Sequence, residues 1–446
     1  MKLWEKTNGS DQRIHQFTSS RDRELDQLIA LSDIVGSIAH VRMLGNVGLI
    51  SVRDAGLIEK ELKILYRQAE HEGLVVDPAC EDIHSHLEMV LTRKLGDAGR
   101  RVHTGRSRND QVILALRLFY RKELGRITAK MQELFDLLLR MAKKHGRRPM
   151  PGYTHMQVAM PSSFGLWFSA FAESLAEDLI PLRAAFQMVN QNPLGSGAGY
   201  GSSFPINREM TTRLLGFEGL NVNSVYAQMS RPKSEITTAS ALAAIAFTLS
   251  RLANDICLYS GENYGFFSLP AEMTTGSSIM PHKRNPDVFE LIRARCNRLQ
   301  HLPAQLTVLV VNLPTGYHRD YQLMKESLLP AFGDMYQCLD LCIDMVRQLR
   351  VSLPGESNRI YDHMYSVEAI NALTQKGIPF RKAYGIVARE IETGTFRPQR
   401  MPGHTHTGSI GNLSLPLIRR RWKYNLKHIP FARAEQAVRL LIEEGS

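Results

Sequence analysis

The chain has 446 residues, of which 43% are hydrophobic and 22% charged, which argues against a disordered chain and fits a globular protein with a substantial core. Its net charge of +11 is compatible with nucleic acid, a membrane surface or a small anionic substrate as the partner. Residues 1–13 contain no apolar signal region, which predicts a cytoplasmic location.

The first chemically suggestive segment is residues 103–111, which read HTGRSRNDQ. Ser107 or Asn109 could cap the helix predicted to follow, whose first free amides attract negative charge. Arg106 and Arg108 could each grip a carboxylate through paired hydrogen bonds. The segment therefore predicts an anion-binding cradle, with helix capping alone as the alternative.

A helix is predicted over residues 109–145, because apolar residues recur there every three or four positions. At 1.5 Å per residue such a helix reaches about 50 Å and needs equally long partners. Four further helical segments fit that role, at residues 162–190, 235–259, 287–311 and 327–351. Alternating β patterns are sparse, so the sequence predicts an all-α, long-helix bundle.

Residues 152–157, GYTHMQ, lie just ahead of the second of these helices. The imidazole of His155 can titrate near neutral pH, and Thr154 places a hydroxyl beside it, which suits proton transfer. A purely structural histidine is the alternative.

Residues 239–258 are apolar on almost every helical face, which indicates the centre of a bundle or of an oligomer. A membrane span is disfavoured because Arg251, Asn254 and Asp255 interrupt the segment. We therefore expect no membrane partner.

Residues 276–287 form the most specific motif, with Gly and Thr on one side, two prolines on the other and Glu290 shortly after. This composition predicts a hinged loop that closes over a substrate and carries hydroxyls and the Lys283 ammonium into a dry site. An ordinary surface turn is the alternative.

Two features near the C-terminus are interpreted as structural. Cys338 and Cys342 are one helical turn apart without a second metal-binding pair, which predicts core packing, and the odd cysteine count fits a reducing compartment without disulfides. Basic and aromatic residues alternate at Arg419, Arg420, Arg421, Trp422, Lys423, Tyr424 and Lys427. No nucleic-acid-binding module accompanies them, so we expect a solvated or subunit-contacting segment and no nucleic acid partner.

Residues 276–286 fit the signature loop of the fumarase/aspartase superfamily: Gly, two Ser, any residue, Met-Pro, any residue, Lys, any residue, Asn-Pro. Within that superfamily, HTGRSRNDQ, GYTHMQ and residues 317–322, YHRDYQ, together with Lys325, resemble the argininosuccinate lyase family. The resemblance extends from LWEK near the start, through residues 36–40, to beyond Lys325, which is roughly three quarters of the chain.

The resemblance implies a fumarase/aspartase-type bundle at residues 106–355, between helical N- and C-terminal domains at residues 1–105 and 356–446. It also implies a homotetramer whose active sites combine segments of different subunits. The implied reaction eliminates arginine from argininosuccinate and releases fumarate, without a metal or an organic cofactor.

The family's catalytic roles transfer to matching residues of this sequence. Deprotonated Ser277 is the implied base, and Lys283, Asn285 and loop amides stabilise the charge that develops on the substrate. His155, oriented by Glu290, is the implied acid for the departing nitrogen. How Ser277 is activated remains open, because a free serine hydroxyl is a weak base.

The same resemblance implies that the substrate's carboxylates and amino-acid end are bound by seven residues, namely Ser107, Asn109, Thr154, Tyr317, Arg319, Gln322 and Lys325. His84 is a weaker candidate that supports them. The chain departs from the usual family pattern at Val158, Met160, His282, Arg284, Leu323 and Met324.

Two alternatives remain open. Another superfamily substrate, such as adenylosuccinate, fumarate or aspartate, would share the signature loop, although HTGRSRNDQ favours argininosuccinate. A non-catalytic helical scaffold is the other alternative, and the intact Ser277, Lys283 and His155 argue against it.

Overall fold

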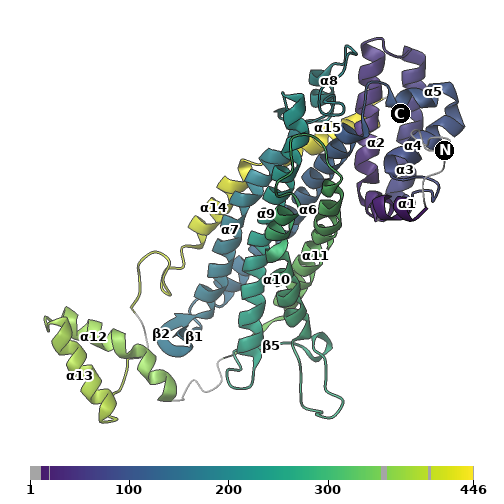
Figure 1. The fold of residues 1–446 in the computed structure, drawn as a ribbon. Helices are drawn as coiled ribbons and strands as arrows, with labels where there is room; N and C mark the ends of the chain where they lie inside the picture. The colour runs from purple at the N-terminus through teal and green to yellow at the C-terminus, as the bar shows by residue number, and fades with distance from the viewer. Residues whose placement is uncertain (1–11, 20, 353–358, 400–402, 445–446) are drawn as a thin grey trace.

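In the described part of the chain, five long helices form the centre of the molecule (Figure 1). They are α6 (Arg108–Lys144), α7 (Phe164–Val189), α9 (Ser224–Ser260), α10 (Asp287–Leu309) and α11 (Asp320–Gln348). The computed structural model describes residues 12–19, 21–352, 359–399 and 403–444. The predicted all-α, long-helix bundle is confirmed.

The bundle helices alternate in direction along the chain (Figure 1). We call the end where α6, α9 and α11 begin the cradle end, and the end where α7 and α10 begin the hairpin end. Helix α6 agrees with the prediction to within one residue, whereas α9 and α11 begin earlier than predicted. Helix α9 runs through Pro232, because the flanking Arg231 and Ser234 are buried in the bundle and tertiary packing holds the turn together.

Helix α9 lies at the centre of the core, as predicted from its uniformly apolar sequence. Leu242, Ile245 and Leu249 are fully buried. By length and composition alone, α9 and α2 (Asp22–Asn46) could cross a membrane, but 61% and 78% of their most apolar windows are buried inside the protein. Burial in the core accounts for their apolar character.

A second group of helices covers the cradle end. Helices α1 (Gln12–Ser19), α2, α3 (Val52–Glu72), α4 (Ile83–Leu95) and α5 (Asp97–Arg100) pack together, followed by the turn η1 (Arg101–His103), and α2 packs along α6 (Figure 1). Helix α8 (Arg208–Leu214) lies at the same end. The predicted domain limit at residues 105/106 remains a prediction.

The described strands are short. Strands β1 (Pro149–Thr154) and β2 (Gln157–Ser163) form an antiparallel hairpin at the hairpin end, which the sequence did not predict. Strand β3 (Gln191–Asn192) pairs in parallel with β4 (Gly219–Leu220), and β5 (Phe267–Ser268) pairs antiparallel with β6 (Arg350–Val351). The turn η2 (Ala271–Met273) follows β5.

The C-terminal part of the chain divides between the two ends. The turn η3 (Arg359–Tyr365), α12 (Ser366–Gln375) and α13 (Phe380–Glu392) lie beyond the hairpin end, where α12 and α13 share a small core. Helix α14 (Leu415–Lys427) then packs along α7, and α15 (Phe431–Glu443) reaches α2 and α6 at the cradle end. The predicted limit at residues 355/356 lies outside the described residues and remains a prediction.

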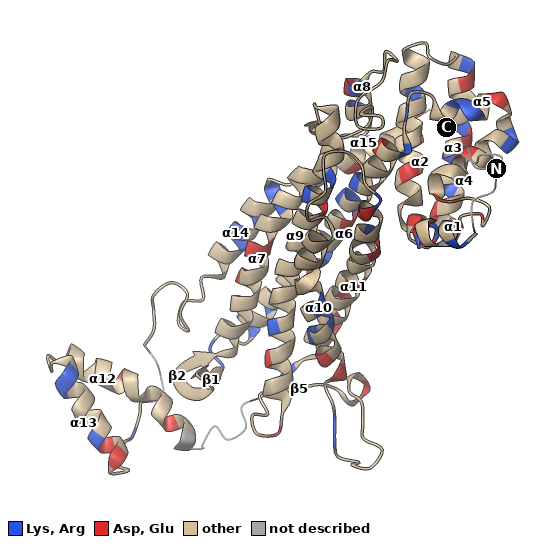
Figure 2. Cartoon of the chain, viewed as in Figure 1, with Lys and Arg blue, Asp and Glu red and all other residues tan. Residues whose placement is uncertain are grey.

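The basic segment on α14 contacts its own chain. Arg419 pairs with Asp136 of α6 at 2.8 Å, and Arg421 pairs with Glu173 at 2.8 Å and Glu177 at 3.0 Å, both of α7, so opposite charges face each other where α14 meets these two helices (Figure 2). Trp422 is buried. These contacts account for Arg419, Arg421 and Trp422 as residues that hold α14 against the bundle. Cys338 and Cys342 are buried in α11, which confirms the prediction of core packing.

Candidate active site

Ser107 is the N-cap of α6. Its Oγ accepts a hydrogen bond from the amide of Asn109 at 3.2 Å, and Asp110 accepts one from the amide of Ser107 at 3.0 Å, which completes a capping box. The side chain of Asn109 makes no hydrogen bond to any described residue and lies half-buried in the first turn. The N-terminus of α6 therefore presents a polar group and a positive dipole end, as an anion cradle requires.

Asp110 connects the cradle to the loop that follows α7. Its second carboxylate oxygen accepts hydrogen bonds from the amides of Gly195 at 3.0 Å and Gly197 at 2.9 Å. Burial raises the pKa of Asp110 to about 6, although the amide hydrogen bonds oppose that shift. This role was not predicted from the sequence, because the loop is far from Asp110 along the chain.

Glu81 brings the start of α6 close to the start of α11. Its carboxylate lies 3.3 Å from Nη1 of Arg108 and 3.5 Å from Nη2 of Arg319. Tyr317 meets the ring of Tyr321 edge-on, with ring centroids 5.8 Å apart. Five of the predicted binding residues on these segments therefore lie at the cradle end: Ser107, Asn109, Tyr317, Arg319 and Gln322.

Lys325, a sixth predicted binding residue, is buried at the same end between two carboxylates of α2. Its Nζ lies 2.7 Å from both Asp22 and Asp26, and Gln322 donates a hydrogen bond to Asp22. Burial alone would lower the pKa of Lys325, but the two carboxylates outweigh burial and the pKa is raised. Lys325 is thus held charged by its own chain, and sequence reasoning missed both of its partners.

His84 lies behind this group and is also buried. Its Nδ1 is 3.1 Å from a carboxylate oxygen of Asp33, which in turn accepts a hydrogen bond from Gln111 on α6 at 2.9 Å. Burial opposes the charge on His84, but Asp33 more than compensates, so its pKa is raised. His84 therefore links α4 to α2, which is a supporting position.

The other predicted residues lie at the hairpin end. His155 and Met156 form the two-residue tip of the β1–β2 hairpin, with φ angles of 51° and 62°. Two-residue hairpin loops favour this left-handed conformation, but side chains other than Gly or Asn rarely adopt it. This strained turn holds the side chains of Thr154 and His155 in exposed positions at the tip of the hairpin. His155 makes no hydrogen bond to any described residue, Glu290 included.

The signature loop leaves β5 and returns into α10 at the same end. Its neck is closed by hydrogen bonds between the backbones of Thr275 and Asn285, at 2.8 and 3.3 Å. Inside the loop, Oγ of Ser277 accepts hydrogen bonds from the amides of Ile279 at 3.3 Å and Met280 at 3.1 Å. Amide donors of this kind stabilise negative charge on an oxygen.

Lys283 in the signature loop is exposed, and Glu290 lies exposed in the first turn of α10. The charged side chains of Lys283 and Glu290 are therefore accessible to a second protein surface.

The two groups of predicted residues lie at opposite ends of one chain (Figure 1). Helix α6 spans 37 residues between them, which corresponds to about 55 Å. The cradle end holds Ser107, Asn109, Tyr317, Arg319, Gln322 and Lys325, and the hairpin end holds Thr154, His155, Ser277, Lys283, Asn285 and Glu290. No single chain brings the two groups together. Within the described ranges, no cluster of three or more His, Cys, Asp and Glu side chains could hold a metal ion.

Comparison with known proteins identifies the family. A family model described as lyase matches residues 5–300. The argininosuccinate lyase of Phocaeicola vulgatus is 49% identical over 441 residues, which is 99% of each chain, and that of Bacteroides fragilis is 48% identical over the same share. The argininosuccinate lyase of Stenotrophomonas maltophilia is 37% identical over 425 residues, or 94% of this chain and 98% of its own.

The chain belongs to the argininosuccinate lyase family. As a member of it, the protein is a carbon–nitrogen lyase.

Solved structures agree on the fold of this argininosuccinate lyase family member. An EDDS lyase variant with bound fumarate matches with a TM-score of 0.76 at 23% identity, covering 98% of this chain and 95% of the other. A class II fumarase from Schistosoma mansoni matches with a TM-score of 0.68 at 18% identity, covering 96% and 97%. The predicted fumarase/aspartase-type bundle is confirmed.

Proposed function

We propose that this protein eliminates arginine from argininosuccinate to give fumarate, as a step of arginine biosynthesis. The observation that carries the proposal is the signature loop, in which two backbone amides donate to Oγ of Ser277 in a full-length relative of argininosuccinate lyases. The substrate is small and anionic, and the dipole end of α6 with its capped first turn suits such a ligand.

The reaction begins when Ser277 removes a proton from the carbon beside one carboxylate of the succinyl group. Negative charge then spreads onto that carboxylate, and Lys283, Asn285 and loop amides stabilise it; one such donor is worth about 3 kcal/mol. The amides of Ile279 and Met280 also favour the deprotonated form of Ser277, which supports its role as base. This suggests how the weakly acidic hydroxyl is activated.

The departing nitrogen of arginine then takes a proton from His155. Glu290 orients the ring and favours its charged form in the assembled site. Because His155 lies exposed at a hairpin tip, it can reach a substrate held by another surface. The carbon–nitrogen bond breaks, the departing nitrogen takes the proton from His155, and arginine leaves as a guanidinium cation while fumarate remains.

The substrate's carboxylates and amino-acid end are held by Ser107, Asn109, Thr154, Tyr317, Arg319, Gln322 and Lys325. Most of these residues gather at the cradle end, so we propose that the cradle of one subunit meets the signature loop and the histidine hairpin of others in a cytoplasmic homotetramer. The domain division at 105/106 and 355/356 belongs to the same proposal.

A direct assay tests the function. Fumarate absorbance should rise when the purified protein receives argininosuccinate, and arginine should appear in equal amount. Adenylosuccinate and aspartate should give at most a small fraction of that rate. If only adenylosuccinate releases fumarate, adenylosuccinate is the substrate. If none of these compounds is turned over, the protein is a non-catalytic helical scaffold.

Replacing Lys325 with Met should raise the Michaelis constant for argininosuccinate more than it lowers turnover, because Lys325 acts in binding rather than in the chemical step. The change also leaves Asp22 and Asp26 buried without their cation, so the free energy of unfolding should fall by about 3 kcal/mol. Steady-state kinetics and denaturant unfolding measure the two effects. Lys325→Arg is the matched control, since it keeps the charge. A fall in turnover at unchanged Michaelis constant would place Lys325 in the chemical step.

A further inference from the structure

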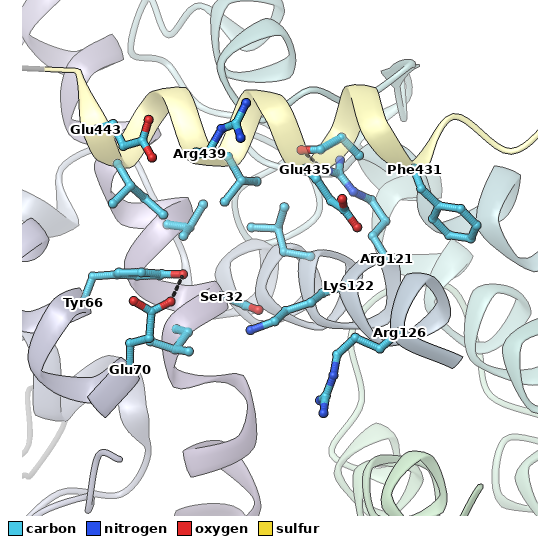
Figure 3. Close-up of a pocket in the computed structure, with 16 residues that line it drawn as sticks. Ser32, Tyr66, Glu70, Arg121, Lys122, Arg126, Phe431, Glu435, Arg439 and Glu443 are labelled. Carbon is cyan, nitrogen blue, oxygen red and sulfur yellow. Dashed lines mark hydrogen bonds between the residues drawn. The ribbon is translucent and has the colours of Figure 1, made fainter. Parts of the chain in front are cut away.

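A cavity of about 440 Å³ lies where α15 crosses α2, α3 and α6, apart from the candidate active site (Figure 3). Its volume is in the range of about 300 to 1,000 Å³ that is typical of sites for small organic molecules. Apolar side chains form a large part of its walls, among them Leu31, Val35, Leu118, Phe431, Val438 and Ile442.

Arg121 is the buried charged group of this cavity, with 4% of its surface exposed. Its guanidinium donates to the side-chain oxygen of Asn190 at 3.3 Å and to the carbonyl of Leu215 at 2.9 Å, and it lies 4.4 Å from the ring of Phe217. All of these partners are uncharged. The Nε atom has no hydrogen-bond partner among the described residues.

A comparison with Arg231 shows what Arg121 lacks. Arg231 is also buried, but it forms an ion pair with Glu235 at 3.2 Å, and that carboxylate outweighs burial and raises its pKa. For Arg121, burial is unopposed and lowers the pKa to about 9. Burying a cation without a counter-charge costs free energy, and an anion that binds beside it offsets that cost.

The rim of the cavity does not supply that anion. Glu70, Glu435 and Glu443 line the cavity, but none forms an ion pair with Arg121 in the described structure. Glu70 accepts a hydrogen bond from the hydroxyl of Tyr66 at 3.4 Å (Figure 3). Three cations also line the cavity, namely Lys122, Arg126 and Arg439, so the rim does not repel negative charge.

We propose that this cavity binds a small organic anion, whose charged group pairs with Arg121 and whose apolar body packs between α2 and α15. A carboxylate and a phosphate monoester both fit the guanidinium, which can donate two parallel hydrogen bonds to either. The bound molecule ties the C-terminal helix to the N-terminal helices, because the cavity walls come from both.

Thermal unfolding of the full-length protein tests the proposal, with benzoate and phenyl phosphate as probes. At about 10 mM, at least one should raise the melting temperature, because a ligand that binds only the folded state stabilises it. Benzyl alcohol has the same apolar body without charge, and inorganic phosphate has charge without that body, so both should have a much smaller effect. The difference between the melting-temperature shifts with benzoate and with phenyl phosphate shows whether the site prefers a carboxylate or a phosphate monoester.

Two variants locate the binding site, with affinity measured by titration calorimetry. Val438→Trp fills the cavity without changing its charge and should weaken binding of the active probe at least about tenfold. Arg121→Gln should weaken it by a similar factor. Arg433→Gln, an exposed arginine of α15 that does not line the cavity, is the matched control and should bind normally.

Three results would overturn the proposal: no stabilisation by either probe, equal stabilisation by benzyl alcohol, or unchanged affinity in Val438→Trp. In each case Arg121 serves only to hold the carbonyls around it. If Arg121→Gln does not fold, the affinity of Val438→Trp for the active probe still tests whether the probe binds in this cavity.

Discussion

Ser277→Ala should lower the turnover of argininosuccinate by at least about a hundredfold while leaving substrate affinity nearly unchanged. The side chain that is lost is the one to which Ile279 and Met280 donate, and it removes a proton only in the transition state. In the proposed mechanism, substrate binding depends mainly on the cradle end, which this change does not alter. Steady-state fumarate release gives the turnover, and calorimetric titration with argininosuccinate gives the affinity.

Ser278→Ala is the matched control for this prediction, because it removes the neighbouring hydroxyl of the same loop, to which we assign no role. It should retain far more activity than Ser277→Ala. Equal activity of Ser277→Ala and the unchanged protein would remove Ser277 from the chemical step and with it the proposed mechanism.

The fold was largely predictable from the sequence, because helical periodicity is a local signal. The recurrence of apolar residues gave α6 to within one residue at each end. The start of α9 was predicted too late, because the helix runs through Pro232, where tertiary burial around Arg231 overrides the tendency of proline to break a helix. The hairpin at residues 149–163 was missed because its tip has no Asn-Gly turn signal.

The candidate site was predictable only in part. The motifs named the residues that carry polar chemistry, but a sequence does not reveal which distant side chains pair. Asp22 and Asp26 lie roughly 300 residues before Lys325, and their carboxylates nevertheless hold its ammonium. The amides that donate to Ser277 depend on the turn of the loop backbone, which residue identities alone do not give.

Mixing two inactive variants should restore activity if the active site is shared between subunits. Ser277→Ala removes the base at the hairpin end, and Asn109→Asp places a negative charge against the substrate carboxylates at the cradle end. The two positions belong to ends of the bundle that are about 55 Å apart in one chain. Each variant alone should therefore be nearly inactive, whereas some sites in a mixed tetramer receive an intact copy of both segments.

Co-expression of the two variants with different affinity tags, followed by sequential purification, provides the mixed assembly. With random mixing and equal amounts, about a quarter of sites combine an unaltered loop with an unaltered cradle, so fumarate release should recover to about that fraction. Pairing Ser277→Ala with Asn285→Ala is the control, because Asn285 and Ser277 belong to the same loop and no mixed site regains an intact one. If the first pair recovers no more activity than this control, the cradle and loop do not come from different subunits, and a single chain must bring its two ends together in some other way.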